Sequence, residues 1–261
     1  MTEKNQAGTG VTLQQSGDVA TLLLNLAQPR NAFLSDDVSQ LTSLLDVSVE
    51  AGARCIVIRG AGAVFSAGWD ITAIDPHGED PMAMIADVVA PFCTKLRELP
   101  VPTISAVSGP ALGFGLGLAL SCDLCIADED ALFGSPFRSI GMVPDTGAHY
   151  YFLQRLGYAM AAELIYTGRL ITGTQAAELG LINRAVATGS VTTQADKLAS
   201  SIASGPTQAF RLSKEILLQG GSHAQMMEHE GRQLARAFAT ADLHEGIAAF
   251  KERRKPVFIG G

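Results

Sequence analysis

The organisation of this chain is clearest in two glycine-rich stretches, Phe65-Ser-Ala-Gly-Trp-Asp-Ile71 and Ser108-Gly-Pro-Ala-Leu-Gly-Phe-Gly-Leu-Gly117. Each follows a short apolar run and precedes a helical pattern, which predicts a strand, a tight turn and a helix start. Backbone N–H groups at such a start, aided by the helix dipole, can hold negative charge on an oxygen. Two such turns could therefore converge on one oxyanion. The alternative is that the glycines only permit tight turns and close helix packing.

Short apolar runs on both sides of these stretches predict buried strands, because Gly, Pro, Asn or Asp ends each run. The four runs are residues 19–25, 55–60, 103–108 and 123–128. A helical pattern with Ser35 as its N-cap follows the first run, and another over residues 82–96 ends before Pro100. Strands that alternate with helices predict an α/β fold.

The pattern becomes helical almost throughout after about Thr146. Pro206 is typical of a helix start, and Gly220 of the position just past a helix end. Gly189 and Ser190 indicate a break before this region. We expect a flexible N-terminal segment, a core that holds the site and a helical C-terminal region, over residues 1–10, 11–189 and 190–261.

Composition excludes several classes of protein. The 261 residues are 47% hydrophobic, enough to bury a core, and 26 acidic against 19 basic residues give a net charge of −7. An acidic chain without a basic run is a poor match for nucleic acid or an anionic membrane. The polar N-terminus lacks the apolar core of a signal peptide, so we expect a cytoplasmic protein. Residues 101–122 are uncharged, but prolines and glycines interrupt them, which indicates buried core rather than a membrane span.

Two partial motifs do not support a dinucleotide site or a metal site. Gly60-Ala-Gly-Ala-Val-Phe65 begins like a dinucleotide-binding fingerprint, but Phe65 stands where the third glycine belongs. Cys122 and Cys125 form a lone C-x-x-C pair whose side chains would face opposite sides of a strand, so we expect no metal site. Together with Cys55 and Cys93 they are expected to be reduced thiols.

The two glycine-rich stretches together resemble the paired motifs of the crotonase (enoyl-CoA hydratase/isomerase) superfamily, and the similarity runs from about Val19 to Phe258. Three further blocks resemble the family: residues 30–34 (RNAFL), 171–183 and 238–255. The resemblance implies the crotonase (ClpP-like) α/β spiral of strand-strand-helix units. It also implies a helical C-terminal region that mediates assembly into a homotrimer or a dimer of trimers.

The resemblance further implies an acyl-CoA thioester substrate whose carbonyl oxygen is held by two peptide N–H groups as it becomes an enolate. Residue by residue, these donors are the N–H groups of Trp69 and Phe114. The implied substrate and coenzyme A contacts are Arg30, Ala32, Ala67, Gly68, Asp70, Ile71, Gly113, Phe137 and His149. Coenzyme A enters as part of the substrate, and no further cofactor or metal is implied.

The chain departs from the family where hydratases carry two glutamates, because the matching positions are Gly117 and Phe137. Hydration needs a base for water and an acid for C2, so the two-glutamate mechanism is in doubt. Asp145, in Gly141-Met-Val-Pro-Asp-Thr-Gly147, occupies the place of the single acid of several enoyl-CoA isomerases of the family. The alternative is that Asp145 caps the following helix. His149, one turn later, could orient Asp145, contact substrate or simply pack.

We therefore expect an enzyme that shifts a 3-enoyl double bond to the 2 position, with Asp145 as acid and base. Rival chemistries are enoyl-CoA hydration, thioester hydrolysis and ring-epoxide isomerisation, since the superfamily uses one oxyanion hole for many reactions. A non-catalytic acyl-CoA binding protein is the rival from another class. A dinucleotide-dependent oxidoreductase is the weakest alternative, because of Phe65.

Overall fold

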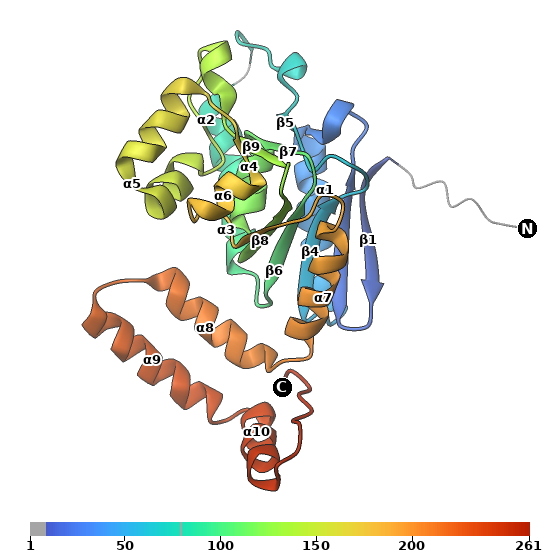
Figure 1. Ribbon diagram of the computed structural model, residues 1–261, viewed down its shortest axis with the longest axis vertical. Coiled ribbons are helices and arrows are strands. Elements are labelled where there is room, and N and C mark those ends of the chain that lie inside the picture. The colour runs from blue at the N-terminus through green and yellow to red at the C-terminus, as the bar shows by residue number, and fades with distance from the viewer. Residues whose placement is uncertain (1–8, 79) are drawn as a thin grey trace, which may run out of the picture.

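A computed structural model describes residues 9–78 and 80–261, so the predicted N-terminal segment, residues 1–10, lies largely outside the described residues. Its centre is a sheet of six strands in the order β1-β2-β4-β6-β8-β11 (Figure 1). The strands are β1 (Gly10–Ser16), β2 (Val19–Asn25), β4 (Cys55–Gly60), β6 (Thr103–Val107), β8 (Leu124–Asp128) and β11 (Arg184–Val186). β1 pairs antiparallel with β2, and the other pairs are parallel. The four apolar runs of the sequence are thus confirmed as neighbouring strands.

Very short strands form two smaller sheets at the ends of the parallel strands. One pairs β3 (Ala32–Phe33) with β5 (Gly68–Trp69). The other has the order β10-β9-β7 and comprises β7 (Pro110–Leu112), β9 (Leu132–Gly134) and β10 (Ile171–Thr172). Both glycine-rich stretches contribute a strand here, so these small sheets fix the backbone of the site.

Helices cover both faces of the large sheet, and the alternation of side chains along β4 shows how. Ile56 and Ile58 point into the main core, whereas Cys55 and Val57 belong to a second cluster with the alanines of α7 (Val191–Ala203). The main-core face is covered by α1 (Ser35–Glu50), α3 (Ala90–Glu98) and α4 (Phe114–Ser121). Every residue of α4 is buried, so the uncharged stretch that contains it is core. None of the helices in the described ranges has the length and apolar character that crossing a membrane requires.

Two details differ from the sequence prediction. The N-cap of α1 is Leu34 rather than Ser35, because the Asp37 carboxylate accepts the Leu34 N–H at 2.9 Å. The helical pattern over residues 82–96 is interrupted: α2 (Pro81–Met84) passes into a π-helical turn (Ile85–Val89) before α3. Pro91 has no N–H to donate to the preceding turn, and the local shift in hydrogen bonding accommodates it.

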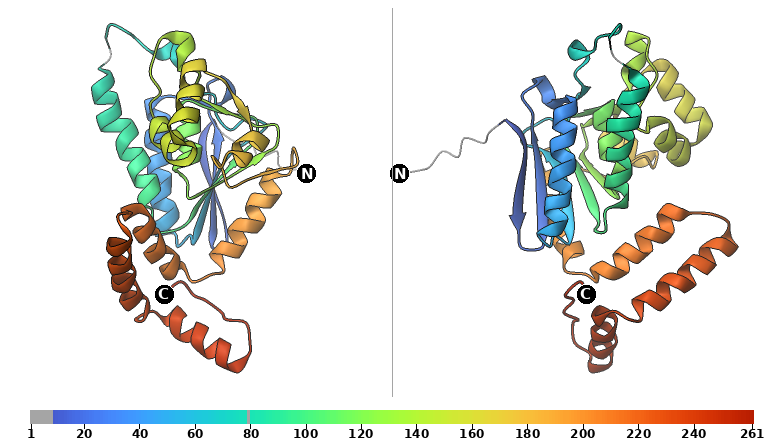
Figure 2. Two further views of the ribbon diagram at one scale, coloured as in Figure 1. Left: turned by 60° about the vertical axis from the view of Figure 1, so that its left-hand side comes forward. Right: turned by 180° about the vertical axis from the view of Figure 1, so that it is seen from behind.

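The remaining helices follow the site in sequence. They are α5 (Ala148–Thr167), α6 (Gly173–Glu178), α8 (Thr207–Gln219), α9 (His223–Ala237) and α10 (Ala241–Glu252). α8, α9 and α10 extend away from the sheet, below it in Figure 1 and again in both views of Figure 2. Pro206 and Gly220 bound α8, as the sequence predicts. The helical character of the C-terminal region is confirmed, although α7, its first helix, packs on the sheet.

Candidate active site

The two glycine-rich stretches lie side by side. The Ser66 N–H donates to the Pro110 carbonyl at 2.9 Å, and the Leu112 N–H donates to the Ser66 carbonyl at 3.0 Å. The Ser66 hydroxyl also donates to the Asn31 carbonyl at 2.8 Å, which ties both stretches to the entry of α1. The turns that follow the two strands are therefore held together by backbone hydrogen bonds.

Glycines at both turns allow the backbones to approach. Gly68 has φ +103° and Gly113 has φ +51°, conformations that side chains rarely adopt. A Cβ on Gly68 would lie 2.6 Å from the Leu112 carbonyl oxygen and 3.4 Å from the Phe114 nitrogen. Phe114 is the first residue of α4, so its N–H has no acceptor within the helix. The turn at Gly68, directly before Trp69, thus lies against the turn that leads into Phe114, so the two predicted donors belong to adjoining turns.

A cavity of about 620 Å³ opens beside these turns. Among the predicted site residues it is lined by Ala32, Ala67, Gly68, Trp69, Asp70, Ile71, Gly113, Phe137 and Asp145. Further lining residues that the sequence did not indicate are Gln28, Pro29, Thr72, Ile74, Met84, Leu112, Pro136, Ser139, Ile140 and Met142. Most of these side chains are apolar, as expected of a site for an acyl group.

Asp145 lies in the segment between the 3₁₀ helix Pro136–Ile140 and α5. The capping alternative does not hold, because Gly147 is the N-cap of α5 and no side chain caps this helix. The Asp145 carboxylate instead accepts a hydrogen bond of 2.7 Å from the Thr146 hydroxyl. Burial raises the pKa of the Asp145 carboxyl, and the hydrogen bond from Thr146 offsets part of that shift. A partly buried carboxylate with a raised pKa can accept and return a proton.

Asp70 is the other acidic residue on the cavity wall, and its carboxylate has a structural partner. It accepts hydrogen bonds from the Thr72 N–H at 3.0 Å and the Thr72 hydroxyl at 2.7 Å, and so caps the 3₁₀ helix Ile71–Ala73. Its N–H donates to the Phe33 carbonyl at 3.0 Å. Asp70 therefore holds the turn at the cavity wall, and Asp145 is the other carboxylate on this wall.

Neither of the positions that match the hydratase glutamates carries a carboxylate. A Cβ on Gly117 would collide with the Thr146 methyl group and carbonyl oxygen, so no side chain fits at this position as the chain is folded. The Phe137 ring lies 3.3 Å from where a Cβ on Gly113 would stand, so it packs against the turn before α4 and presents an apolar group to the cavity.

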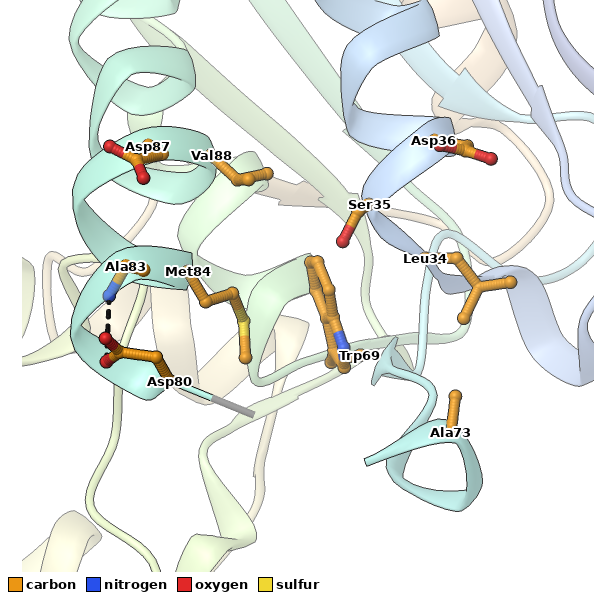
Figure 3. Close-up of a pocket in the computed structure, with 10 residues that line it drawn as sticks. All are labelled: Leu34, Ser35, Asp36, Trp69, Ala73, Asp80, Ala83, Met84, Asp87 and Val88. Atoms are coloured by element: carbon orange, nitrogen blue, oxygen red, sulfur yellow. Dashed lines mark hydrogen bonds between the residues drawn. The ribbon is translucent and has the colours of Figure 1, made fainter. Parts of the chain in front are cut away.

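A second cavity of about 510 Å³ adjoins the first, and Trp69 and Met84 line both. Figure 3 shows the two side chains beside one another, with Ser35 across the indole. The Trp69 ring meets the buried Phe114 ring edge-on, with centroids 5.6 Å apart. The Trp69 side chain thus packs against Phe114 and separates the two cavities.

Three predicted residues do not line the main cavity with their side chains. Arg30 is exposed with φ +57°, and its carbonyl accepts the Ala67 N–H at 2.9 Å. His149 is exposed on α5. The Phe114 side chain is buried in the core, which leaves only its N–H for the site.

The cysteines take no part in the cavity wall. Burial raises the pKa of Cys55 to about 12 and that of Cys125 to about 11, so both remain neutral thiols. All four cysteines are free. Across residues 9–78 and 80–261, no cluster of three or more His, Cys, Asp or Glu side chains is placed to hold a metal ion.

Comparison with known proteins agrees with this geometry. The family model described as enoyl-CoA hydratase/isomerase matches residues 14–261. The chain belongs to the enoyl-CoA hydratase/isomerase family. It is 36% identical over 250 residues to the mitochondrial enoyl-CoA hydratase domain-containing protein 2 of Bos taurus, with 93% of this chain and 84% of the relative covered. Members of this family act on acyl-CoA thioesters, and the same holds for this chain.

Solved structures of the enoyl-CoA hydratase/isomerase family share the fold. An enoyl-CoA hydratase subunit I of Geobacillus kaustophilus superposes with a TM-score of 0.89 at 32% identity, covering 97% of this chain and 99% of that one. An enoyl-CoA hydratase of Bacillus anthracis gives a TM-score of 0.89 at 29% identity, covering 97% and 100%. The predicted crotonase fold is confirmed.

Proposed function

We propose that this family member isomerises 3-enoyl-CoA thioesters to 2-enoyl-CoA thioesters, with Asp145 as the single acid and base. The observation that carries the proposal is the Asp145 carboxylate on the wall of the cavity that Trp69 and Gly113, the residue before Phe114, also line. Isomerisation needs one group that removes a proton and returns it elsewhere, together with a site for the enolate oxygen. This cavity supplies both.

The proton and electron transfers balance without another reactant. The Asp145 carboxylate takes a proton from C2, and the electrons of that C–H bond form a C1=C2 bond as the thioester oxygen becomes negative. The N–H groups of Trp69 and Phe114 hold this oxygen in the dienolate. When the carbonyl re-forms, C2 bonds doubly to C3, the former C3=C4 electrons take the proton from Asp145 at C4, and the carboxylate is regenerated.

Hydration is the less favoured chemistry because it needs more groups than the cavity offers. Gly117 and Phe137 have no titratable side chain, and the Asp70 carboxylate serves as the cap of the 3₁₀ helix Ile71–Ala73. Asp145 alone would have to activate water and then protonate C2. The relatives named above carry the word hydratase in their own names, and that activity is the direct competitor in the test.

The test follows the absorbance of the conjugated thioester with a 3-enoyl-CoA and, separately, with a 2-enoyl-CoA. We expect absorbance to rise with the 3-enoyl ester, and the Asp145→Asn variant to lose this activity while still binding the ester. Asp87→Asn is the matched control, since Asp87 is an exposed acid beside the adjoining cavity. Falling absorbance with the 2-enoyl ester would mean hydration instead. Binding without either change would favour another thioester reaction or a non-catalytic acyl-CoA binder.

We further propose that the chain assembles as a homotrimer or a dimer of trimers through its C-terminal helices. Supporting this, Phe250 on α10 is 86% exposed and Phe238, just after α9, is 58% exposed. An apolar cavity of about 410 Å³ between α8 and α10 lies beside Phe250. Large exposed apolar groups of this kind mark protein interfaces. Light scattering on a sizing column should return three or six chain masses, and a monomer alone would contradict the proposal.

A further inference from the structure

Thr146 has an unusual position next to the proposed base. It is 4% exposed, and its φ of +50° is rare for any residue with a branched Cβ. Gly147, which follows, has φ +78°, so the backbone passes through two left-handed residues before α5 begins. Residues held in such conformations are kept there by their surroundings and occur often at functional sites.

The packing of α4 explains how this conformation is kept. Gly117 leaves a hollow on the helix surface, and the Thr146 methyl group and carbonyl fill the space where a side chain on Gly117 would stand. The methyl group therefore faces α4. A β-branched side chain has few rotamers, so fixing its methyl group also fixes its hydroxyl.

The fixed hydroxyl points at the carboxylate of Asp145. The Thr146 Oγ1 donates to the Asp145 Oδ1 at 2.7 Å. A carboxylate has two oxygens, and a bond to Oδ1 leaves Oδ2 available to a substrate proton. The hydroxyl can thus set the orientation of the carboxylate toward the cavity.

We infer that Thr146 is a positioning residue for the reaction: its methyl group is anchored over Gly117, and its hydroxyl orients Asp145 for proton transfer. This inference rests on the proposed role of Asp145 as the base. Thr146 itself does not line the cavity, so it acts through the carboxylate.

Other ionisable groups behind Asp145 do not replace this contact. From α3 the Cys93 thiol interacts electrostatically with Asp145, and burial raises the pKa of that thiol to about 11, so it stays neutral below that pH. Arg97 and Tyr151 interact with Cys93 behind it. From α5, His149 is exposed. The Thr146 hydroxyl is therefore the group whose removal should change the titration of Asp145.

Two variants separate the hydroxyl from the shape of Thr146. Thr146→Val keeps the branched side chain and removes the donor, whereas Thr146→Ser keeps the donor and removes the anchoring methyl group. For Thr146→Val we expect kcat to fall by about tenfold or more, with KM nearly unchanged, because the carboxylate loses the hydrogen bond that orients it toward the substrate. The acid limb of the pH–rate profile should move to higher pH, and Thr146→Ser should restore the limb. A purely structural role would change stability in Thr146→Val and leave the limb where it is.

A measurement on the free protein makes the inference independent of activity. With ¹³C-labelled aspartate, the Asp145 carboxyl signal can be assigned by its loss in Asp145→Asn and then titrated in each variant. We expect its midpoint to rise in Thr146→Val and not in Thr146→Ser; an equal midpoint in wild type and Thr146→Val overturns the inference. If the wild-type protein fails to isomerise any 3-enoyl-CoA but the midpoint still moves, the proposed function fails while the contact between the two side chains stands.

Discussion

Replacing Gly117 by alanine tests whether Thr146 fills the place of the hydratase glutamate. Within a helix, Gly→Ala normally stabilises a protein by about 1 kcal/mol. At Gly117 the new Cβ would collide with the Thr146 methyl group and with its backbone carbonyl, which cannot rotate away as a flexible side chain would. Overpacking of this kind costs about 1–3 kcal/mol, so the two effects oppose each other.

Gly231→Ala is the matched control, because Gly231 also lies inside a helix, α9, and an added Cβ there meets no atom within 4 Å. Both variants gain the same stability from replacing glycine by alanine within a helix. The difference between their free energies of unfolding is therefore the cost of overpacking at Gly117, about 1–3 kcal/mol. Urea unfolding followed by circular dichroism, at one protein concentration, measures it; in a thermal melt each kcal/mol is about 2–4 °C. Equal stabilisation of both variants would refute the packing of Thr146 on Gly117, and with it the steric exclusion of a glutamate there.

Two further predictions concern the substrate and pH. Trp69→Ala should join the two cavities and favour substrates with longer acyl chains. Each additional buried methylene is worth about 0.8 kcal/mol, or roughly a fourfold increase in kcat/KM. If kcat/KM depends on acyl chain length in the same way in the variant and the wild type, Trp69 does not separate the two cavities. Burial raises the pKa of the Asp145 carboxyl, so the folded state binds the carboxyl proton more tightly than the unfolded state does. The stabilisation that results is present at acid pH and is lost as the pH rises through the pKa of the folded state. At neutral pH, Asp145→Asn should therefore unfold at a higher denaturant concentration than the wild type, and this difference in midpoint should disappear at acid pH. An equal difference at both pH values would show that the pKa of the Asp145 carboxyl is not raised by folding.

Continuous apolar runs, each ended by Gly, Pro, Asn or Asp, identified the strands that make up most of the large sheet. β2 and β4 have the predicted bounds, and β6 and β8 are each one residue shorter than predicted. These strands are buried on both faces, which gives the continuous apolar runs that sequence patterns detect. The strands of two or three residues, such as β3 and β5, were not predicted, because so short a segment carries no period.

The site was predictable where it is local in sequence and not where it depends on distant packing. The two glycine turns were found from their own residues, whereas Asp145 was singled out by the resemblance to the family. Met84 reaches the cavity from the helical segment that contains the π-turn, and no local pattern marks it. The capping alternative for Asp145 was wrong because Thr146 and Gly147 adopt positive φ and displace the helix start. Charge and spacing alone could not show the collision of Thr146 with a side chain on Gly117.

The central claim is that one carboxylate moves one proton, and a 3-enoyl-CoA deuterated at C2 tests it most directly. With the wild-type protein we expect slower turnover than with the unlabelled ester, and some deuterium at C4 of the product, because Asp145 removes the label and returns it. Asp145→Asn should convert the ester at least about 100-fold more slowly, since general acid–base catalysis contributes that much or more. Conversion by Asp145→Asn at the wild-type rate, with the same isotope pattern, would contradict the account.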